Sequence, residues 1–203
     1  MEFVFLLFVL VISVVVHEVS HGAVANSLGD PTAKNAGRLT LNPIGHVDPV
    51  GSLLLPFLLI LSGGPVIGWA KPVPINPFML KNQTWAPALV SLAGPGSNLA
   101  LALVFGLLVR FLPLETLSPL FSGALVSVVQ LNLYLALFNL VPIPPLDGSH
   151  LLFAFLPKSL EPLKMFLARY GFFILLFLVF LFPPFLSFLS FLVRTLLVVF
   201  VGA

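Results

Sequence analysis

Long apolar runs recur along this 203-residue chain and limit what it can fold into. Only 8% of its residues are charged, whereas a soluble domain carries about 25%. The mean hydropathy is +1.15. The chain therefore cannot be an ordinary soluble domain, and its composition predicts an all-α integral membrane protein.

Five apolar runs are candidates for membrane spans, and they cover residues 3–25, 50–61, 86–112, 120–141 and 172–201. A helix that crosses a bilayer needs about 20 apolar residues. The first, third and fourth runs each supply that length, and the last supplies two shorter segments broken at Pro183 and Pro184. We therefore expect a polytopic bundle of about five to six transmembrane helices. Residues 50–61 either re-enter the membrane or cross it.

The first run is expected to remain in the mature protein, because no Lys or Arg precedes it and it is longer than the apolar part of a signal peptide. The absence of Cys excludes disulfides, thiolate metal sites and Cys nucleophiles. The nine Lys and Arg residues are scattered in loops, which indicates membrane topology and no nucleic-acid partner.

Residues 14–22 read Val-Val-Val-His-Glu-Val-Ser-His-Gly, within the first apolar run. This run is expected to form a helix over about residues 3–28, ended by Pro31. On that helix His17 and His21 share one face, so both can bind one metal ion, and Glu18 projects beside them. The spacing suits zinc.

The pattern His-Glu-x-x-His is often no more than two surface histidines on the helix of a soluble protein. Here the neighbours are Val and Ala, which do not solvate polar groups. A carboxylate in a membrane span is unfavourable by roughly 2.5 to 3.5 kcal/mol on insertion scales. Glu18 beside two histidines therefore indicates a functional site.

A third metal ligand could come from residues 141–148, Val-Pro-Ile-Pro-Pro-Leu-Asp-Gly. The Pro residues prevent a regular helix, so Asp147 lies on an unwound stretch, which must be buried in protein or line a water-filled cavity. Alternatively, Asp147 caps the following helix. His46 and Asp48 are rival ligands in a segment rich in Gly and Pro, or they belong to a polar turn at the membrane surface.

Two further segments have irregular or polar sequences. Residues 68–76 cannot be helical, because each Pro biases its predecessor to extended geometry. They could hold a substrate as an added strand, or form a surface loop with Trp69 at the interface. Small residues at 91–98 let a neighbouring helix approach closely, and Asn98 could hydrogen-bond a ligand, a substrate or that helix.

The basic residues indicate which way the bundle faces. If the span at 86–112 leads outward and the span at 120–141 returns, most Lys and Arg residues fall on the cytoplasmic side, and Arg110 and Glu115 fall outside. Asp147 then emerges at the same side as the histidine pair.

Together these motifs resemble the site-2 protease family of intramembrane zinc metalloproteases. The resemblance rests on His-Glu-Val-Ser-His-Gly at 17–22, Ala93-Gly94-Pro95 with Asn98, and Asn-Leu-Val-Pro-Ile-Pro-Pro-Leu-Asp-Gly at 139–148. Residues 42–51 and 68–74 are further similar to a compact prokaryotic branch of the family. We find no room for the peptide-binding PDZ domain that some relatives insert.

The resemblance implies one Zn²⁺ per chain, bound by His17, His21 and Asp147, with Glu18 as the catalytic carboxylate. Asn139 is the candidate that would stabilise the oxyanion. The implied activity is hydrolysis of peptide bonds within or near transmembrane segments of membrane-protein substrates, as in regulated intramembrane proteolysis. The implied location is a prokaryotic cell (inner) membrane, with the active site nearer the cytoplasmic face.

We expect a single membrane-embedded domain over residues 1–203, with a re-entrant or extended loop near the active site. Its catalytic core would cover about residues 1–157, and a C-terminal helical hairpin about residues 168–203. The alternative function is a non-hydrolytic membrane protein, either a metal carrier or a pseudoprotease that binds a single-span partner. No role is assigned to His150.

Overall fold

The computed structural model describes residues 2–54, 70–112 and 118–202, with the backbone alone for residues 2, 3, 49, 52 and 53. These residues form helices joined by irregular segments, and none of them is in a strand. The α-helices are α1 (Glu2–Ser27), α2 (Thr32–Asn35), α4 (Ala86–Phe111), α5 (Pro119–Asn139), α6 (Gly148–Phe155), α7 (Glu161–Leu181) and α8 (Pro183–Val201). Short helical turns between them are η1 (Pro43–His46), η2 (Pro49–Leu54), η3 (Pro77–Met79) and η5 (Lys158–Leu160).

Within the described residues, five helices are long and apolar enough to cross a membrane, and they cover Val4–Ser27, Ala86–Phe111, Pro119–Asn139, Lys158–Leu181 and Pro183–Val201. The prediction of an all-α, polytopic membrane protein is thus confirmed. The run expected at 50–61 is described as far as Leu54, the end of η2. The remainder of that run lies outside the described residues, as do Trp69 and Glu115.

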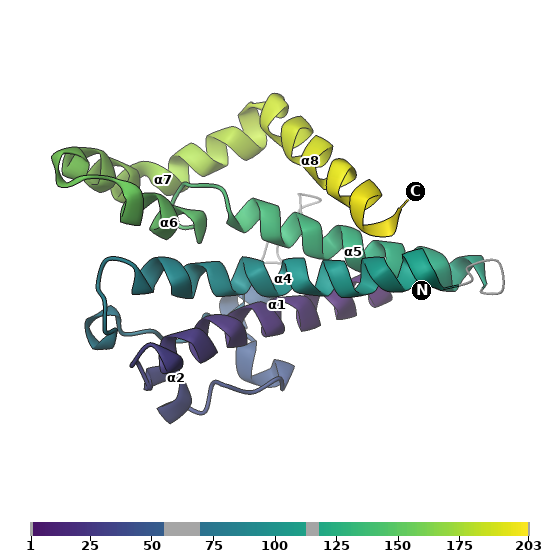
Figure 1. Ribbon diagram of the computed structural model, residues 1–203, viewed down its shortest axis with the longest axis horizontal. Helices are drawn as coiled ribbons and strands as arrows, with labels where there is room; N and C mark the ends of the chain where they lie inside the picture. The colour runs from purple at the N-terminus through teal and green to yellow at the C-terminus, as the bar shows by residue number, and fades with distance from the viewer. Residues whose placement is uncertain (1, 55–69, 113–117, 203) are drawn as a thin grey trace.

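Helices α1, α4 and α5 lie side by side and form the centre of the bundle, with α4 in contact with both of the others (Figure 1). Two buried clusters hold these helices together. One joins α4, α5 and α8 through Ala102, Val129, Leu133 and Val193. The other joins α1 to the start of α4 through Ala25, Leu80, Ala86 and Val90. Packing on both faces of α4 therefore fixes α1 relative to α5.

Helix α1 ends in a turn organised by the buried carboxylate of Asp30. Its oxygens accept hydrogen bonds from the backbone N–H of Thr32 at 3.0 Å, from the Thr32 hydroxyl, and from the backbone N–H of Asn76 at 2.6 Å. Burial alone would raise the pKa of Asp30, but these hydrogen bonds stabilise the charged form and hold the pKa below its ordinary value. Asp30 thus ties the end of α1 to the segment that precedes η3.

The chain unwinds between α5 and α6, where the sequence predicts an irregular stretch. The Pro144–Pro145 peptide bond is cis. Gly148 begins α6 against the main chain of residues 140 and 141, and a Cβ there would lie 2.7 Å from the Val141 carbonyl oxygen. Gly171 of α7 contacts Pro144 in the same way, since its added Cβ would lie 2.6 Å from the Pro144 carbonyl oxygen. Two glycines therefore let the unwound stretch pack tightly before Asp147.

The C-terminal helices α7 and α8 meet at Phe182 and diverge as an open V (Figure 1). α7 begins at Glu161, earlier than the start near residue 168 that we expect for the C-terminal helical hairpin. α8 packs its end on α4, where Gly106 contacts Phe200 and Arg110 donates a hydrogen bond to the Val199 carbonyl oxygen at 3.3 Å. The division into core and C-terminal unit stays a prediction.

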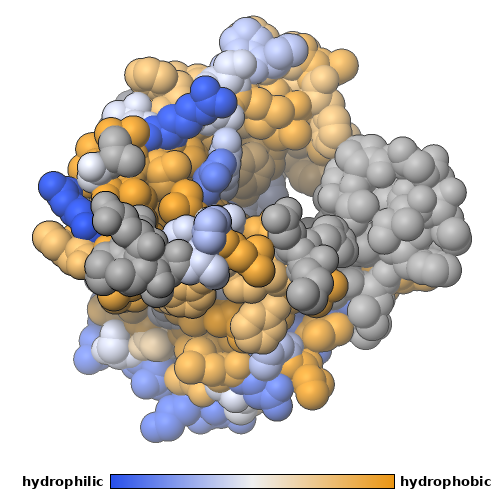
Figure 2. Space-filling view, turned by 90° about the vertical axis from the view of Figure 1, so that its right-hand side faces the viewer, coloured by the Kyte–Doolittle hydropathy of each residue, from blue (hydrophilic) through white to orange (hydrophobic). Residues whose placement is uncertain are grey.

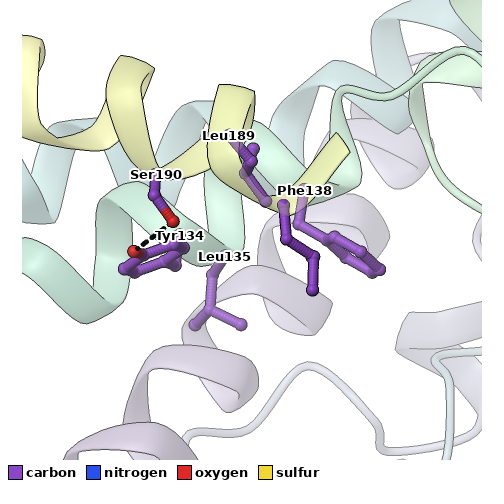
Figure 3. Close-up of a pocket in the computed structure, with 6 residues that line it drawn as sticks. Tyr134, Leu135, Phe138, Leu189 and Ser190 are labelled. Atoms are coloured by element: carbon purple, nitrogen blue, oxygen red, sulfur yellow. Dashed lines mark hydrogen bonds between the residues drawn. The ribbon is translucent and has the colours of Figure 1, made fainter. Parts of the chain in front are cut away.

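A groove of about 420 Å³ lies between α5 and α8 (Figure 3). The Tyr134 hydroxyl donates a hydrogen bond to Ser190 Oγ at 3.1 Å across it, and the other lining side chains are Leu or Phe. Seen from the end of the bundle where both termini lie, hydrophobic residues cover most of the described surface, with hydrophilic residues in patches (Figure 2). Large exposed side chains such as Phe8, Phe173 and Phe188 are consistent with contact to lipid.

Gly148→Ala is expected to lower the free energy of unfolding by about 1–3 kcal/mol, because its Cβ would overlap main-chain atoms that cannot rotate away. The control is Gly123→Ala on α5, since Gly123 is exposed and a Cβ there has nothing within 4 Å. This control should raise helix stability by about 0.5–1 kcal/mol. Reversible denaturation of both variants in detergent measures the difference, and equal effects would contradict the packing at Gly148.

Candidate metal centre

Helix α1 and the stretch before α6 bring two imidazoles and one carboxylate together. Nε2 of His17 lies 3.1 Å from Oδ2 of Asp147, and Nε2 of His21 lies 3.4 Å from the same oxygen. The three potential ligand atoms lie within 4.8 Å of one another. His17 and His21 are 6% and 7% exposed. Across the described part of the chain, this is the group of three His, Asp or Glu side chains that could hold a metal ion.

The alternative role of Asp147 as a helix cap is not observed. Asp147 occupies the N-cap position of α6, but its side chain accepts no capping hydrogen bond. The carboxylate points instead to the two histidines of α1. Residues 130 positions apart thus meet, as the metal hypothesis requires.

Gly94 of α4 leaves open the space between the two imidazoles. A Cβ added at Gly94 would overlap Nε2 of His17 and Nε2 of His21, and it would be equally distant from both. The expectation that small residues here allow close helix approach is confirmed, because α1 packs directly on this point of α4. Two imidazole nitrogens and a carboxylate oxygen around such a space match a catalytic zinc site with three protein ligands.

Each imidazole is fixed through its other nitrogen. His21 Nδ1 lies 2.7 Å from the carbonyl oxygen of Val90. A carbonyl oxygen accepts only, so His21 Nδ1 carries the hydrogen, and Nε2, on the side of Asp147, is the nitrogen that can bind a metal ion. His17 Nδ1 lies 2.6 Å from Oδ1 of Asn98. Asn98 therefore contacts α1 through His17 and bonds α5 through Asn132, which is the interhelical hydrogen bonding that the sequence allows.

Glu18 lies beside the histidines and is held by a different part of the chain. Its Oε2 accepts a hydrogen bond from the backbone N–H of Val73 at 2.9 Å. Pro72 and Pro74 have no N–H, so Val73 supplies the single donor of this tripeptide. Gly22 lets the segment approach α1, since a Cβ there would lie 2.8 Å from Val73 Cγ1. Residues 70–76 are not helical, as predicted, and the segment contacts the helix that carries the histidines through Val73.

The other expected candidates lie outside the cluster. Asn139 donates a hydrogen bond from Nδ2 to the Leu135 carbonyl oxygen at 2.9 Å. His46 is buried, with Nε2 at 2.9 Å from the Thr40 carbonyl oxygen. Asp48 Oδ1 accepts hydrogen bonds from the backbone of residues 50 and 51 at the start of η2. His150 is exposed and is not grouped with the three clustered side chains.

Two contacts of the site were not expected from the sequence, namely those of Val73 and Asn132. For each residue, the sequence contains a feature that could have predicted its contact. Val73 lies between two prolines, so its N–H is isolated in the sequence. Asn132 is a polar residue in an apolar run, which requires a buried partner.

The sequence matches peptidase family M50 over residues 5–127 and 114–181. It is 43% identical over 178 residues to "Putative zinc metalloprotease YwhC" of Bacillus subtilis (strain 168), which covers 85% of this chain and 78% of that protein. It is 37% identical over 141 residues to "Putative zinc metalloprotease Rip2" of Mycolicibacterium smegmatis, covering 67% of this chain and 51% of that protein. The Rip2 protein of Mycobacterium tuberculosis (strain H37Rv) is 35% identical over 159 residues, covering 76% and 60%. No solved structure matches significantly.

The family match spans most of the chain and includes, in whole or in part, four of the five described helices that could cross a membrane, all except Pro183–Val201. The relative from Bacillus subtilis is similar over most of its own length, whereas the chain spans between half and two thirds of the Rip2 proteins. The family resemblance read from the motifs is therefore confirmed. The chain belongs to peptidase family M50, the site-2 protease family of membrane-embedded metalloproteases.

Proposed function

We propose that this chain is an intramembrane zinc endopeptidase that hydrolyses peptide bonds within or near transmembrane segments of membrane-protein substrates, in regulated intramembrane proteolysis. The observation that carries the proposal is the meeting of His17, His21 and Asp147 on one space inside an apolar helix bundle. Zinc metalloproteases with a His-Glu-x-x-His helix hold the metal with both histidines and a third ligand.

His17, His21 and Asp147 would hold one Zn²⁺ through their Nε2 and carboxylate oxygen atoms. A bound zinc ion supplies a Lewis acid for the scissile carbonyl and makes water nucleophilic near neutral pH. Gly94 supports the assignment, because its missing side chain leaves room at the point shared by both Nε2 atoms. Three protein ligands leave further coordination positions for water and substrate.

Glu18 is the proposed general base. It neighbours His17 in the sequence but is not in the ligand group, so its carboxylate is available for proton transfer. The Val73 N–H holds Oε2, and Oε1 is left to take a proton from water and pass it to the leaving amine. Asn139 is the proposed oxyanion donor, since its Nδ2 has a second hydrogen beyond the one given to Leu135.

The catalytic end of the bundle is proposed to face the cytoplasm of a prokaryotic cell, in the inner membrane. α2 and α6 lie at the opposite end of the bundle from the two termini (Figure 1). Lys34 of α2 and Lys158 of η5 follow the rule that basic residues stay on the cytoplasmic side. Membership of a peptidase family favours hydrolysis over the metal-carrier alternative.

Glu18→Gln is expected to retain bound zinc and to lose at least about 100-fold in the rate of cleavage of a model transmembrane substrate, because general bases contribute about 10²–10⁴-fold. Zinc content of the detergent-purified protein and substrate cleavage in liposomes are measured on one preparation. If the variant cleaves at the normal rate, Glu18 is not the base. If the unaltered protein binds zinc and transports it without cleaving, it is a carrier.

Asp147→Asn is expected to lower the zinc content well below one per chain, because it replaces a charged ligand oxygen facing both histidines. The matched control is Asp48→Asn, whose carboxylate accepts backbone hydrogen bonds at η2 and should not affect zinc. Elemental analysis after dialysis against a weak chelator gives both values. The reverse result would move the third ligand to Asp48.

Gly94→Ala is expected to reduce zinc binding at least about tenfold, because the methyl group would occupy the space between the two Nε2 atoms. Gly96→Ala, two residues along α4, is the control, since a Cβ at Gly96 has nothing within 4 Å. Competition of both variants with a zinc-binding dye measures the affinities. Normal zinc binding by Gly94→Ala would show that the metal does not occupy this space.

A further inference from the structure

A chain of buried amides runs from His17 across the centre of the bundle. His17 Nδ1 of α1 lies 2.6 Å from Asn98 Oδ1 of α4. Asn98 Nδ2 donates to Asn132 Oδ1 of α5 at 2.9 Å, and Asn132 Nδ2 donates to the Val128 carbonyl oxygen at 2.9 Å. Asn98 and Asn132 have no exposed surface. The three central helices are thus joined by one line of hydrogen bonds that ends at His17.

The backbone carbonyls at this chain fix its direction. The Val128 carbonyl oxygen can only accept, so Asn132 must turn Nδ2 toward it and Oδ1 toward Asn98. Asn98 must then turn Nδ2 toward Asn132, where the Ser13 carbonyl oxygen is a second acceptor at 3.4 Å. Reversing either amide would bring two acceptor oxygens together in a buried site, which is unfavourable. Asn98 therefore presents its oxygen to His17.

This direction sets the tautomer of His17. Since Asn98 Oδ1 accepts, His17 Nδ1 carries the hydrogen, and the lone pair of Nε2 is directed at the space shared with His21 and Asp147. His21 reaches the same state through a single backbone carbonyl, that of Val90. His17 Nδ1 instead meets the Asn98 side chain, so His17 depends on side chains from two other helices.

The geometry points to Asn98, supported by Asn132, as a positioning residue that holds His17 in its metal-binding tautomer and orientation. The inference rests on the proposed zinc centre and extends it to α5. If these residues served only to pack α4 against α5, the hydrogen bond between Asn98 and Asn132 would be sufficient. The short contact from Asn98 to the imidazole is an additional interaction, and it is the one that bears on the metal.

Two substitutions at Asn98 separate positioning from packing. Asn98→Leu removes both the acceptor for His17 and the donor to Asn132, while Asn98→Asp removes the donor but keeps an oxygen for His17. Both should lower the unfolding temperature in detergent. Zn²⁺ affinity, measured by competition with a chelating dye, should fall about 10- to 100-fold in Asn98→Leu and stay within a few-fold in Asn98→Asp. Equal losses in both variants, or no loss in Asn98→Leu, would overturn the assignment.

Asn132→Leu tests the supporting role and should weaken Zn²⁺ binding less than Asn98→Leu, because His17 keeps its direct partner. Gln130→Leu is its control, since Gln130 is exposed on the same helix.

¹⁵N NMR of the imidazoles in the metal-free, unaltered protein at pH 8 gives a readout without zinc. A hydrogen on Nδ1 of His17 is expected, whether or not Nε2 also carries one toward Asp147 in the metal-free protein, and an Nδ1 without a hydrogen would overturn the inference. If the unaltered protein binds no zinc, the proposed function is refuted. The NMR measurement of the His17 tautomer would still show whether Asn98 orients His17.

Discussion

Polar side chains inside a bilayer must find partners within the protein, and this constraint organises the centre of the bundle. α1 carries three ionisable side chains in five residues, and between them they contact three other segments. His17 contacts α4 and the stretch before α6, Glu18 accepts from Val73, and His21 contacts Val90. Displacing any one of these segments would leave a buried polar group without its partner, so the pairing of α1 fixes its neighbours.

Small residues make these pairings possible. Around the histidines, Gly22, Gly94 and Gly148 each lie where a Cβ would overlap another segment. Gly22 admits residues 70–76 to α1, Gly94 admits the imidazoles to α4, and Gly148 admits the start of α6 to the end of α5. The dimensions of the site therefore depend on these glycines, which have no side chain, as much as on the polar groups that line the site.

The sequence predicted the spans and the histidine pair for physical reasons, whereas Asp147 as the third ligand followed from the family resemblance. Apolar runs of sufficient length define helices in lipid, and a four-residue spacing places His17 and His21 on one face. The contacts of Val73 and Asn132 were missed, because helical periodicity fixes neighbours within a helix but not which residue of another segment faces them. The open V of α7 and α8 was missed for the same reason, since hydropathy sets the length of a helix and not its crossing angle.

The segment that holds Glu18 is itself fastened by pairings outside α1. At one end the Lys71 N–H donates to the His46 carbonyl oxygen at 2.9 Å. At the other end the Asn76 N–H donates to Asp30. Between these two points Pro72 and Pro74 flank Val73, and the Val73 N–H donates to Glu18. The orientation of the proposed base therefore depends on loop residues distant in the sequence, whereas the two histidines are oriented by contacts with α4.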